Sequence, residues 1–166
     1  VATVLGFLTA CSGDSSPTAP SAPPANVAGQ YGTSITASST CSANLPSETR
    51  LLEFLATVTQ TGASVQVQLI AHVPGVPEVT FSGTVSGQTV TFPSFSFTQT
   101  MGRGAALAAS GNATVGAGTN ASITGTLNGT YQTASGASCN ATNHQLQMIK
   151  LCLTPTATGT AMLPCQ

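Results

Sequence analysis

The stretch that decides the fold reads Val79-Thr80-Phe81-Ser82-Gly83-Thr84-Val85. Apolar and polar positions alternate in it with a period of two, which is typical of a strand with one buried face and one wet face. Residues 64–69 and 121–127 repeat the same pattern, again with hydroxyl or amide side chains on the wet face. Half-buried strands of this kind belong to antiparallel sheets. We therefore expect an all-β domain.

Working outward from this stretch, short turns that carry glycine separate further runs of the same type. Glycine supplies the positive φ that tight hairpins require. Residues 51–58 also place leucine and valine at helical spacing, so a short helix is an alternative there. The eight expected strands cover about residues 29–38, 50–60, 64–72, 78–86, 88–99, 105–115, 121–132 and 143–152.

The fifth run changes phase in its middle. Val90 and Phe92 lie on one face of a regular strand, whereas Phe95 and Phe97 lie on the other. Pro93-Ser94 stands at the change, and proline inside a sheet is confined to edges and bulges. We predict a β-bulge or bend at this point.

Eight antiparallel strands with short loops favour an up-and-down barrel, because closure removes exposed strand edges. A two-sheet β-sandwich is the alternative. The meander resembles the calycin group, which includes the lipocalins and the avidin-like proteins, and Gly29-Gln30-Tyr31 opens its first strand. Lipocalins have Gly-x-Trp there with a late Arg over the Trp, and this chain has Tyr31 and Lys150 instead. The resemblance implies a calycin-like barrel over residues 27–166.

The cysteines can be paired through the barrel topology. Apart from Cys11 there are four, which allow three connectivities. In a closed meander, Cys41 after the first strand and Cys139 before the last lie at the same end of adjacent strands. We therefore expect the disulfides Cys41–Cys139 and Cys152–Cys165.

Alternation also predicts which side chains point into the barrel. The larger ones are Val79, Phe81, Val85, Leu107, Val115, Ile123, Leu127 and Tyr131, and the small ones are Gly83, Ala109, Gly111, Ala113, Gly125 and Gly129. Small residues among them leave two interpretations: a hollow interior that binds a ligand, or a filled interior in which glycines relieve strand bending. We favour the filled interior. If a ligand binds inside, the expected contacts are Tyr31, Phe81, Leu107, Ile123, Leu127 and Lys150.

The beginning of the chain carries a localisation signal. Leu8-Thr9-Ala10-Cys11 ends an uncharged apolar run and resembles the lipobox of bacterial lipoproteins. The resemblance implies that residues 1–10 belong to a signal peptide and that Cys11 becomes the lipidated first residue. Residues 11–26 then form a Ser-, Pro- and Ala-rich tether. Ser12, rather than Asp, follows the cysteine, which implies outer-membrane anchoring with the domain facing the periplasm or the cell surface.

Composition excludes several classes of function. Only 4% of residues are charged, with 3 basic and 4 acidic side chains, so the basic stripe that nucleic-acid binding needs is absent. The chain contains no nucleophile elbow and no His-Glu-x-x-His, and His72 and His144 are expected near strand ends at the rim or surface. We expect no enzyme, no cofactor and no metal site.

Two hypotheses of function remain. The first is an outer-envelope lipoprotein whose barrel binds a small or apolar ligand, or a peptide. The second is an accessory subunit that docks on an envelope complex or a surface filament, which the charge-poor Thr-, Ser- and Asn-rich faces favour.

Overall fold

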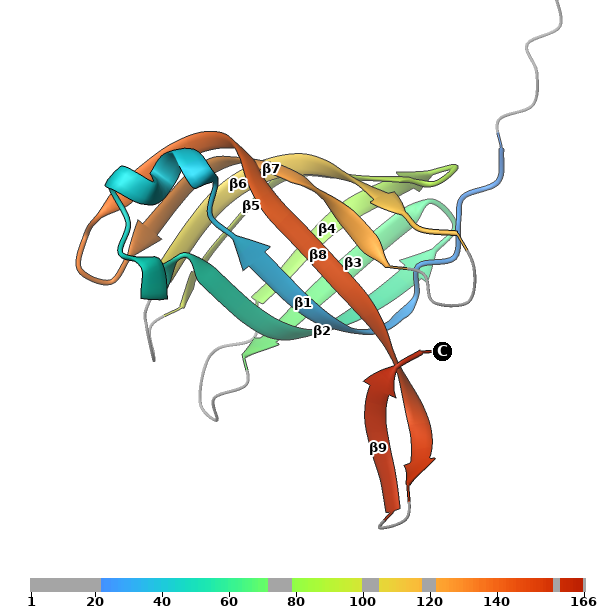
Figure 1. Ribbon diagram of the computed structural model, residues 1–166. Helices are drawn as coiled ribbons and strands as arrows, with labels where there is room; N and C mark the ends of the chain where they lie inside the picture. The colour runs from blue at the N-terminus through green and yellow to red at the C-terminus, as the bar shows by residue number, and fades with distance from the viewer. Residues whose placement is uncertain (1–21, 72–78, 100–104, 118–121, 157–158, 166) are drawn as a thin grey trace, which may run out of the picture.

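The domain is a closed antiparallel β-barrel with one extra strand (Figure 1). The computed structural model describes residues 22–71, 79–99, 105–117, 122–156 and 159–165. Each strand pairs with the next along the chain, and β1 also pairs with β8, which confirms the predicted eight-stranded barrel. The strands are β1 (Gly29–Thr36), β2 (Leu51–Thr61), β3 (Ser64–Ala71), β4 (Val79–Ser86), β5 (Thr89–Gln99), β6 (Ala105–Val115), β7 (Ile123–Thr133), β8 (Ser138–Thr156) and β9 (Gly159–Pro164).

The helix considered over residues 51–58 is wrong, because this segment is β2. Leu52, Phe54, Ala56 and Val58 are buried at every second position. Ala56 completes this period-two face, although it is too small to stand out in a hydropathy pattern. The helical spacing in the sequence arose because only the large apolar side chains were considered, without Ala56.

Two short 3-10 helices, η1 (Ser39–Ala43) and η2 (Ser47–Thr49), lie between β1 and β2 at the end of the barrel opposite the start of β1 (Figure 1). The Ser38 side chain caps η1 by accepting a hydrogen bond from the Thr40 N–H. Cys41 and Leu45 in this connection are buried. The segment therefore contributes to the core at this end.

The two expected disulfides are confirmed. Cys41–Cys139 joins the η1 segment to the start of β8, and Cys152–Cys165 closes the hairpin of β8 and β9. β9 was not predicted, because its Thr- and Pro-containing sequence lacks apolar alternation. The outer half of this hairpin projects away from the barrel (Figure 1).

The predicted bulge is present at Pro93-Ser94, where the β5–β6 register shifts between Phe92 and Phe95. The extra residue brings Phe95 and Phe97 back to the inner face, so that both are buried together with Phe92. A second bulge, which was not predicted, shifts the register between Leu127 and Gly129 on β7 and β8.

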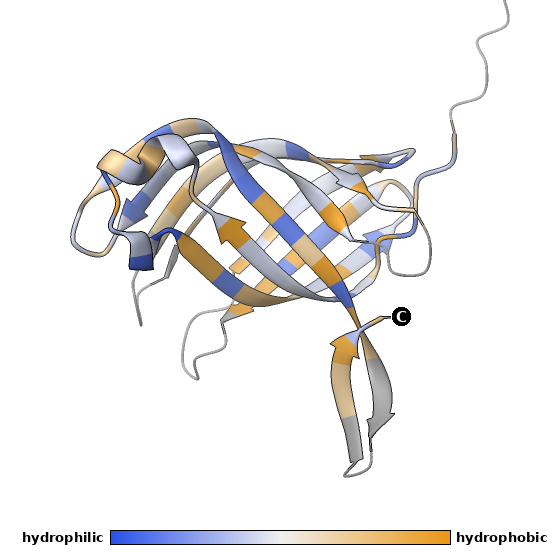
Figure 2. Ribbon diagram, in the orientation of Figure 1, coloured by the Kyte–Doolittle hydropathy of each residue, from blue (hydrophilic) through white to orange (hydrophobic). Residues whose placement is uncertain are grey.

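The interior is filled in the part of the chain that the structure describes. Of the positions predicted to point inward, Val79 and Phe81 are only partly buried. At most 5% of each of the following is exposed: Val85, Leu107, Val115, Ile123, Leu127 and Tyr131. Alternating apolar and polar colours along the strands reflect this inside–outside pattern (Figure 2).

The glycines of β6 and β7 do not line a void. A Cβ on Gly129 would lie 2.0 Å from the carbonyl oxygen of Ala108, and one on Gly125 would lie 2.2 Å from that of Asn112. Real side chains do not tolerate such separations, so glycine here permits close approach of the two backbones. These glycines therefore do not line a hollow interior.

Candidate ligand-binding site at the β4–β5 seam

Four of the six residues proposed to contact a ligand lie in the packed core. Their side chains are 0–1% exposed, and they are Tyr31, Leu107, Ile123 and Leu127. The Tyr31 hydroxyl donates a hydrogen bond of 2.8 Å to the carbonyl oxygen of Val27. Burial raises the pKa of Tyr31 to about 12. A ligand could reach these side chains only if the core opened.

Lys150, the fifth candidate, is the register partner of Tyr31 across β1 and β8. Its side chain lies over Gly29, where a Cβ would be 2.8 Å from Lys150 Cε and 3.8 Å from the Tyr31 ring. Gly29 also has φ 147°, a backbone conformation that favours glycine. Lys150 thus lies close to Tyr31 near the start of β1.

Phe81, the sixth candidate, differs from these five in its surroundings. It is partly buried and lies on β4, where the pairing with β5 is short. That ladder contains three pairs: Thr84 with Thr91, Val85 with Val90, and Ser86 with Thr89. We call the remaining boundary, between residues 79–83 of β4 and residues 92–99 of β5, the β4–β5 seam.

A covalent feature of Pro93 explains why the ladder stops. Antiparallel pairs alternate between hydrogen-bonded and non-bonded positions. Val85 donates its N–H to Ala63 on the β3 side, so it is a non-bonded position toward β5, and Thr84 is a bonded one. The next bonded pair would join Ser82 to Pro93, but proline has no N–H to donate. The missing N–H removes one of the two hydrogen bonds that this pair would form, and the ladder ends after Thr84.

All five described phenylalanines gather in a cluster that extends beneath the seam. The rings of Phe81 and Phe95 stack with centroids 4.3 Å apart and an interplanar angle of 14°. Phe92 meets Phe81 edge-on at 5.5 Å. Phe97 and Phe54 extend the cluster into the barrel through a further edge contact of 5.4 Å. We call the stacked pair Phe81 and Phe95 the aromatic floor of the seam.

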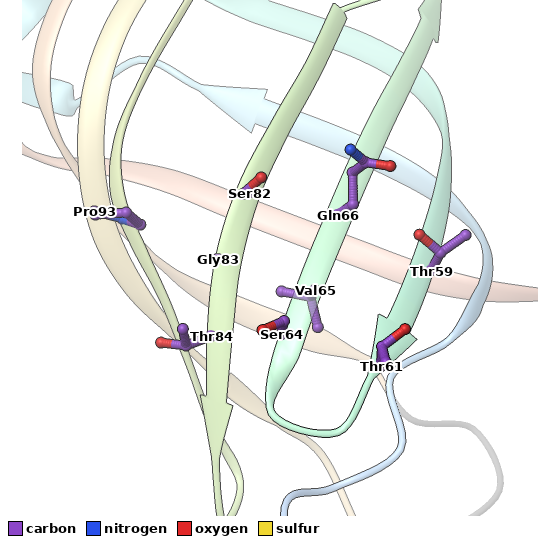
Figure 3. A pocket seen from close by; sticks show the side chains of 9 residues that line it. All are labelled: Thr59, Thr61, Ser64, Val65, Gln66, Ser82, Gly83, Thr84 and Pro93. Carbon is purple, nitrogen blue, oxygen red and sulfur yellow. The ribbon is translucent and has the colours of Figure 1, made fainter.

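The outer side of the seam is polar and concave. A depression of about 510 Å³ there includes Pro93 and residues of β2, β3 and β4 (Figure 3). No residue of its lining carries a charge. Its hydroxyl and amide side chains are Thr59, Thr61, Ser64, Gln66, Ser82 and Thr84. The residues that line it include neither Phe81 nor Phe95, so the depression lies on the outer face of β2, β3 and β4 and reaches the seam at Ser82, Gly83 and Pro93.

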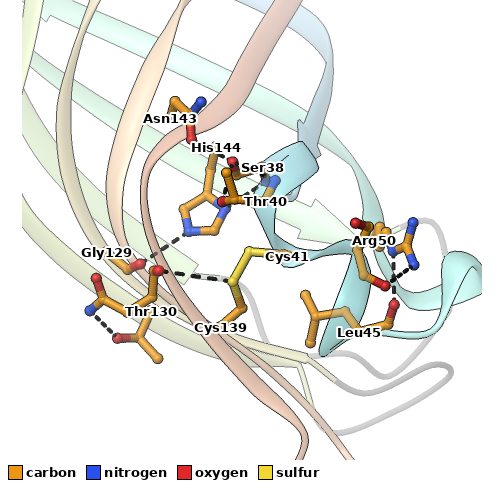
Figure 4. The surroundings of a disulfide bond; sticks show 12 residues. Ser38, Thr40, Cys41, Leu45, Arg50, Gly129, Thr130, Cys139, Asn143 and His144 are labelled. Carbon is orange, nitrogen blue, oxygen red and sulfur yellow. Dashed lines mark hydrogen bonds between the residues drawn. A yellow bond between two sulfur atoms is a disulfide. The ribbon is translucent and has the colours of Figure 1, made fainter.

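His144 marks a structural cluster near η1 rather than a second site (Figure 4). Its side chain is 0% exposed, so the expectation of a surface histidine is wrong for it. Nδ1 accepts the N–H of Ser38 at 3.1 Å, and Nε2 lies 3.0 Å from the carbonyl oxygen of Gly129. This arrangement requires the neutral ring with its proton on Nε2. Both nitrogens are engaged, so the ring offers no free base.

Several predicted features lie outside the described residues, namely Cys11, residues 1–10, most of the tether and His72. Within the described ranges, no three His, Cys, Asp or Glu side chains come together as a metal site would need. In the same part of the chain, no helix has the length and apolar character needed to cross a bilayer.

Sequence reasoning found the bulge at Pro93 but missed the seam. The sequence did contain a sign of the seam. A turn at Gly87-Gln88 places Pro93 opposite Ser82, and a regular ladder needs an N–H from the residue at that position. Comparisons with protein-family models, curated proteins and solved structures find nothing that matches this chain.

Proposed function

We propose that this protein is a non-catalytic binding module of the outer envelope, anchored through a lipid on Cys11, which takes an apolar ligand or peptide at the β4–β5 seam. The observation that carries the proposal is the interrupted β4–β5 ladder above a stacked pair of rings, one of which, Phe81, is only partly buried. Aromatic side chains that remain partly exposed offer apolar area to a ligand.

The energetics favour an uncharged ligand. Burying an apolar side chain completely is worth roughly 1.5–3 kcal/mol, so covering Phe81 supplies a useful part of a binding free energy. A charged group beside the neutral residues of the seam would lose hydration without gaining a partner. The filled interior supports a ligand at the wall of the barrel rather than at its centre.

Ligand binding can be tested on the mature chain with Cys11→Ser, which leaves the lipid out. We expect Nile red and long-chain fatty alcohols to bind, with affinity at least tenfold lower in Phe81→Ala. Leu51→Ala is the matched control, since Leu51 is 41% exposed on the outer face of β2, away from the seam. Native mass spectrometry and fluorescence titration measure the effect. The proposal fails if no apolar compound is retained or if Phe81→Ala binds as well as the control.

The anchor requires a separate experiment. Cells that express the complete precursor are labelled with a radioactive fatty acid, and we expect label in the native protein but not in Cys11→Ser. Mass analysis of the mature protein should also find residues 1–10 removed. Retention of these residues without acyl groups would contradict the localisation.

A second candidate function is that of an accessory subunit in an envelope assembly. The large apolar side chains with high exposure lie on β2, β8 and β9, and they are Leu51, Ile149, Met162 and Leu163. A depression of about 320 Å³ at the base of the hairpin includes Ile149, Leu151 and Pro164. Isolation from native membranes should then recover a stoichiometric protein partner that Met162→Ser with Leu163→Ser loses. Recovery of a lone monomer would count against this function.

A further inference from the structure

The hairpin of β8 and β9 extends from the end of the barrel at which β1 begins. The β1–β8 ladder stops at Gln30 with Leu151, whereas β8 continues beside β9 as far as Thr156. The β8–β9 pairs run from Leu151 with Pro164 to Thr156 with Gly159, a length of roughly 17 Å at the usual rise of a strand. The outer part of the hairpin thus projects beyond the barrel (Figure 1).

The described part of β9 exposes apolar side chains on both of its faces. Successive residues of a strand point to opposite faces. Met162 and Leu163 are successive, and they are 38% and 44% exposed. Residues 151–165 contain no charged side chain. A protein partner seated against one face would leave the apolar side chain on the other face in water, whereas an apolar medium that surrounds the hairpin covers both.

The N-terminal segment of the chain joins the barrel at this same end. The Ala25 N–H donates to the carbonyl oxygen of Gly87 in the β4–β5 turn at 2.8 Å, and the Val27 N–H donates to Gln60 Oε1 at 2.7 Å. Cys11 lies 14 positions before Ala25, and a Ser-, Pro- and Ala-rich segment of this length is expected to span roughly 20–40 Å. A lipid on Cys11 would therefore hold the end that carries the hairpin nearest to the bilayer.

The charges of the described residues favour the same orientation. Glu48, Arg50 and Glu53 lie on η2, directly after it and near the start of β2, toward the opposite end of the barrel. Lys150 lies at the base of the hairpin, one position before Leu151. Among the described residues, the hairpin end therefore carries a positive charge and no negative one. Membrane surfaces that contain anionic lipids attract basic side chains.

We propose that the hairpin of β8 and β9 is a membrane contact, in which Met162 and Leu163 enter the boundary between headgroups and acyl chains of one leaflet. This inference rests on the proposed lipid anchor and adds a second contact to it. A two-stranded hairpin has unpaired main-chain groups along its outer edges, so it belongs at the interface and not in the hydrocarbon core. The disulfide Cys152–Cys165 holds its two strands together at the base.

The first test places a single tryptophan in a chain that has none. Cys11 is the one cysteine outside the two disulfides, so a maleimide phospholipid can be coupled to it in the mature chain. The product is incorporated into vesicles of phosphatidylethanolamine and phosphatidylglycerol with brominated acyl chains. We expect the emission of Leu163→Trp to shift to shorter wavelength and to be quenched at least twofold, because bromine quenches on contact.

Leu51→Trp is the matched control for this measurement. Leu51 is 41% exposed, close to the 44% of Leu163, but it pairs with Thr36 at the opposite end of the barrel. We expect its emission to be the same with brominated and with unbrominated lipids. Equal quenching of the two variants, or no quenching of Leu163→Trp, would overturn the inference.

The second test measures what the apolar side chains contribute to binding. A maleimide with one acyl chain is coupled to Cys11, because a single chain binds a membrane only marginally. We expect Met162→Ser with Leu163→Ser to lower the partition coefficient into vesicles of the same lipids, unbrominated, at least fivefold in a sedimentation assay. Leu51→Ser should leave it unchanged. Equal partitioning of the double variant and this control would overturn the inference.

These results are independent of whether cells acylate Cys11, because the lipid is attached chemically. If Leu163→Trp is quenched but the labelled precursor carries no acyl group, the hairpin contact stands and the proposed anchor is overturned. If the precursor is acylated but Leu163→Trp is not quenched, the anchor stands and the hairpin contact is overturned. The exposed side chains are then left to the protein partner of the second candidate function.

Discussion

At the scale of single residues, the protein depends on positions where only one side chain fits. Gly125 and Gly129 allow β6 and β7 to approach, Gly29 adopts a positive φ, and Pro93 ends a ladder. Each of these residues acts through the absence of a group, either a Cβ or an N–H. Substitutions that return the missing group therefore test the structure more sharply than truncations do.

Gly129→Ala should destabilise the barrel. Its Cβ would lie 2.0 Å from the carbonyl oxygen of Ala108 and 2.7 Å from the Cα of Ala109, so backbone must move. Overpacking of this kind costs about 1–3 kcal/mol. Gly32→Ala is the control, because its nearest neighbour is a Leu151 methyl carbon at 3.9 Å. Urea unfolding measures both variants, and equal stabilities would contradict the close approach.

Tyr31 should make stability depend on pH only in alkaline solution. Burial raises the pKa of Tyr31 from 10.0 to about 12. Because the unfolded chain loses this proton first, the stabilisation is complete below pH 10 and is lost as pH rises toward 12. Unfolding measured across this window should show a smaller decrease for Tyr31→Phe than for the native chain. The same decrease in both would rule out the Tyr31 linkage.

At the scale of elements, the two disulfides constrain different structures. Cys41–Cys139 joins segments 98 positions apart across the closure of the barrel, whereas Cys152–Cys165 closes a hairpin of 13 positions. The outer part of that hairpin projects from the barrel (Figure 1). The first bond therefore restricts the unfolded barrel, and the second acts mainly on the hairpin.

Removing each disulfide should separate these roles. Cys41→Ser with Cys139→Ser should lower the free energy of unfolding by about 4–5 kcal/mol, the loop-entropy value for a closure of this size. Cys152→Ser with Cys165→Ser should leave barrel unfolding nearly unchanged and increase proteolysis within the hairpin. Calorimetry and limited proteolysis distinguish the outcomes. A larger loss of barrel stability from the second pair would contradict this division.

At the scale of the whole molecule, a nearly uncharged exterior surrounds an apolar, filled interior. The chain has a formal net charge of −1, and 4% of its residues are charged. Long-range electrostatic steering therefore contributes little to any encounter. Recognition must rest on apolar contact and on neutral hydrogen bonds, which is the combination present at the seam.

Ligand binding should accordingly be almost independent of salt. We expect the affinity for Nile red to change by less than about twofold between roughly 50 and 500 mM sodium chloride, because salt screens charges and not apolar contact. Fluorescence titration provides the measurement. A steep decrease with salt would show that charged groups dominate binding and would contradict the neutral site.

The sequence alone determined the features that depend on neighbouring residues. Alternation defined the strand faces, glycines the hairpin turns, and the phase change at Pro93-Ser94 the bulge. Given a closed meander, strand order also determined both disulfide pairs. These features are predictable because side-chain direction in a strand and backbone freedom in a turn are local properties of the chain.

Only the tertiary structure decided how strands far apart in the chain come together. It placed Tyr31, Leu107, Ile123 and Leu127 in a filled core, buried His144 against η1, and ended the β4–β5 ladder at Thr84. These outcomes depend on register and closure between segments that local alternation leaves undetermined. Neighbouring residues can thus indicate which side of a strand is apolar, but the path of the whole sheet decides whether that side is covered.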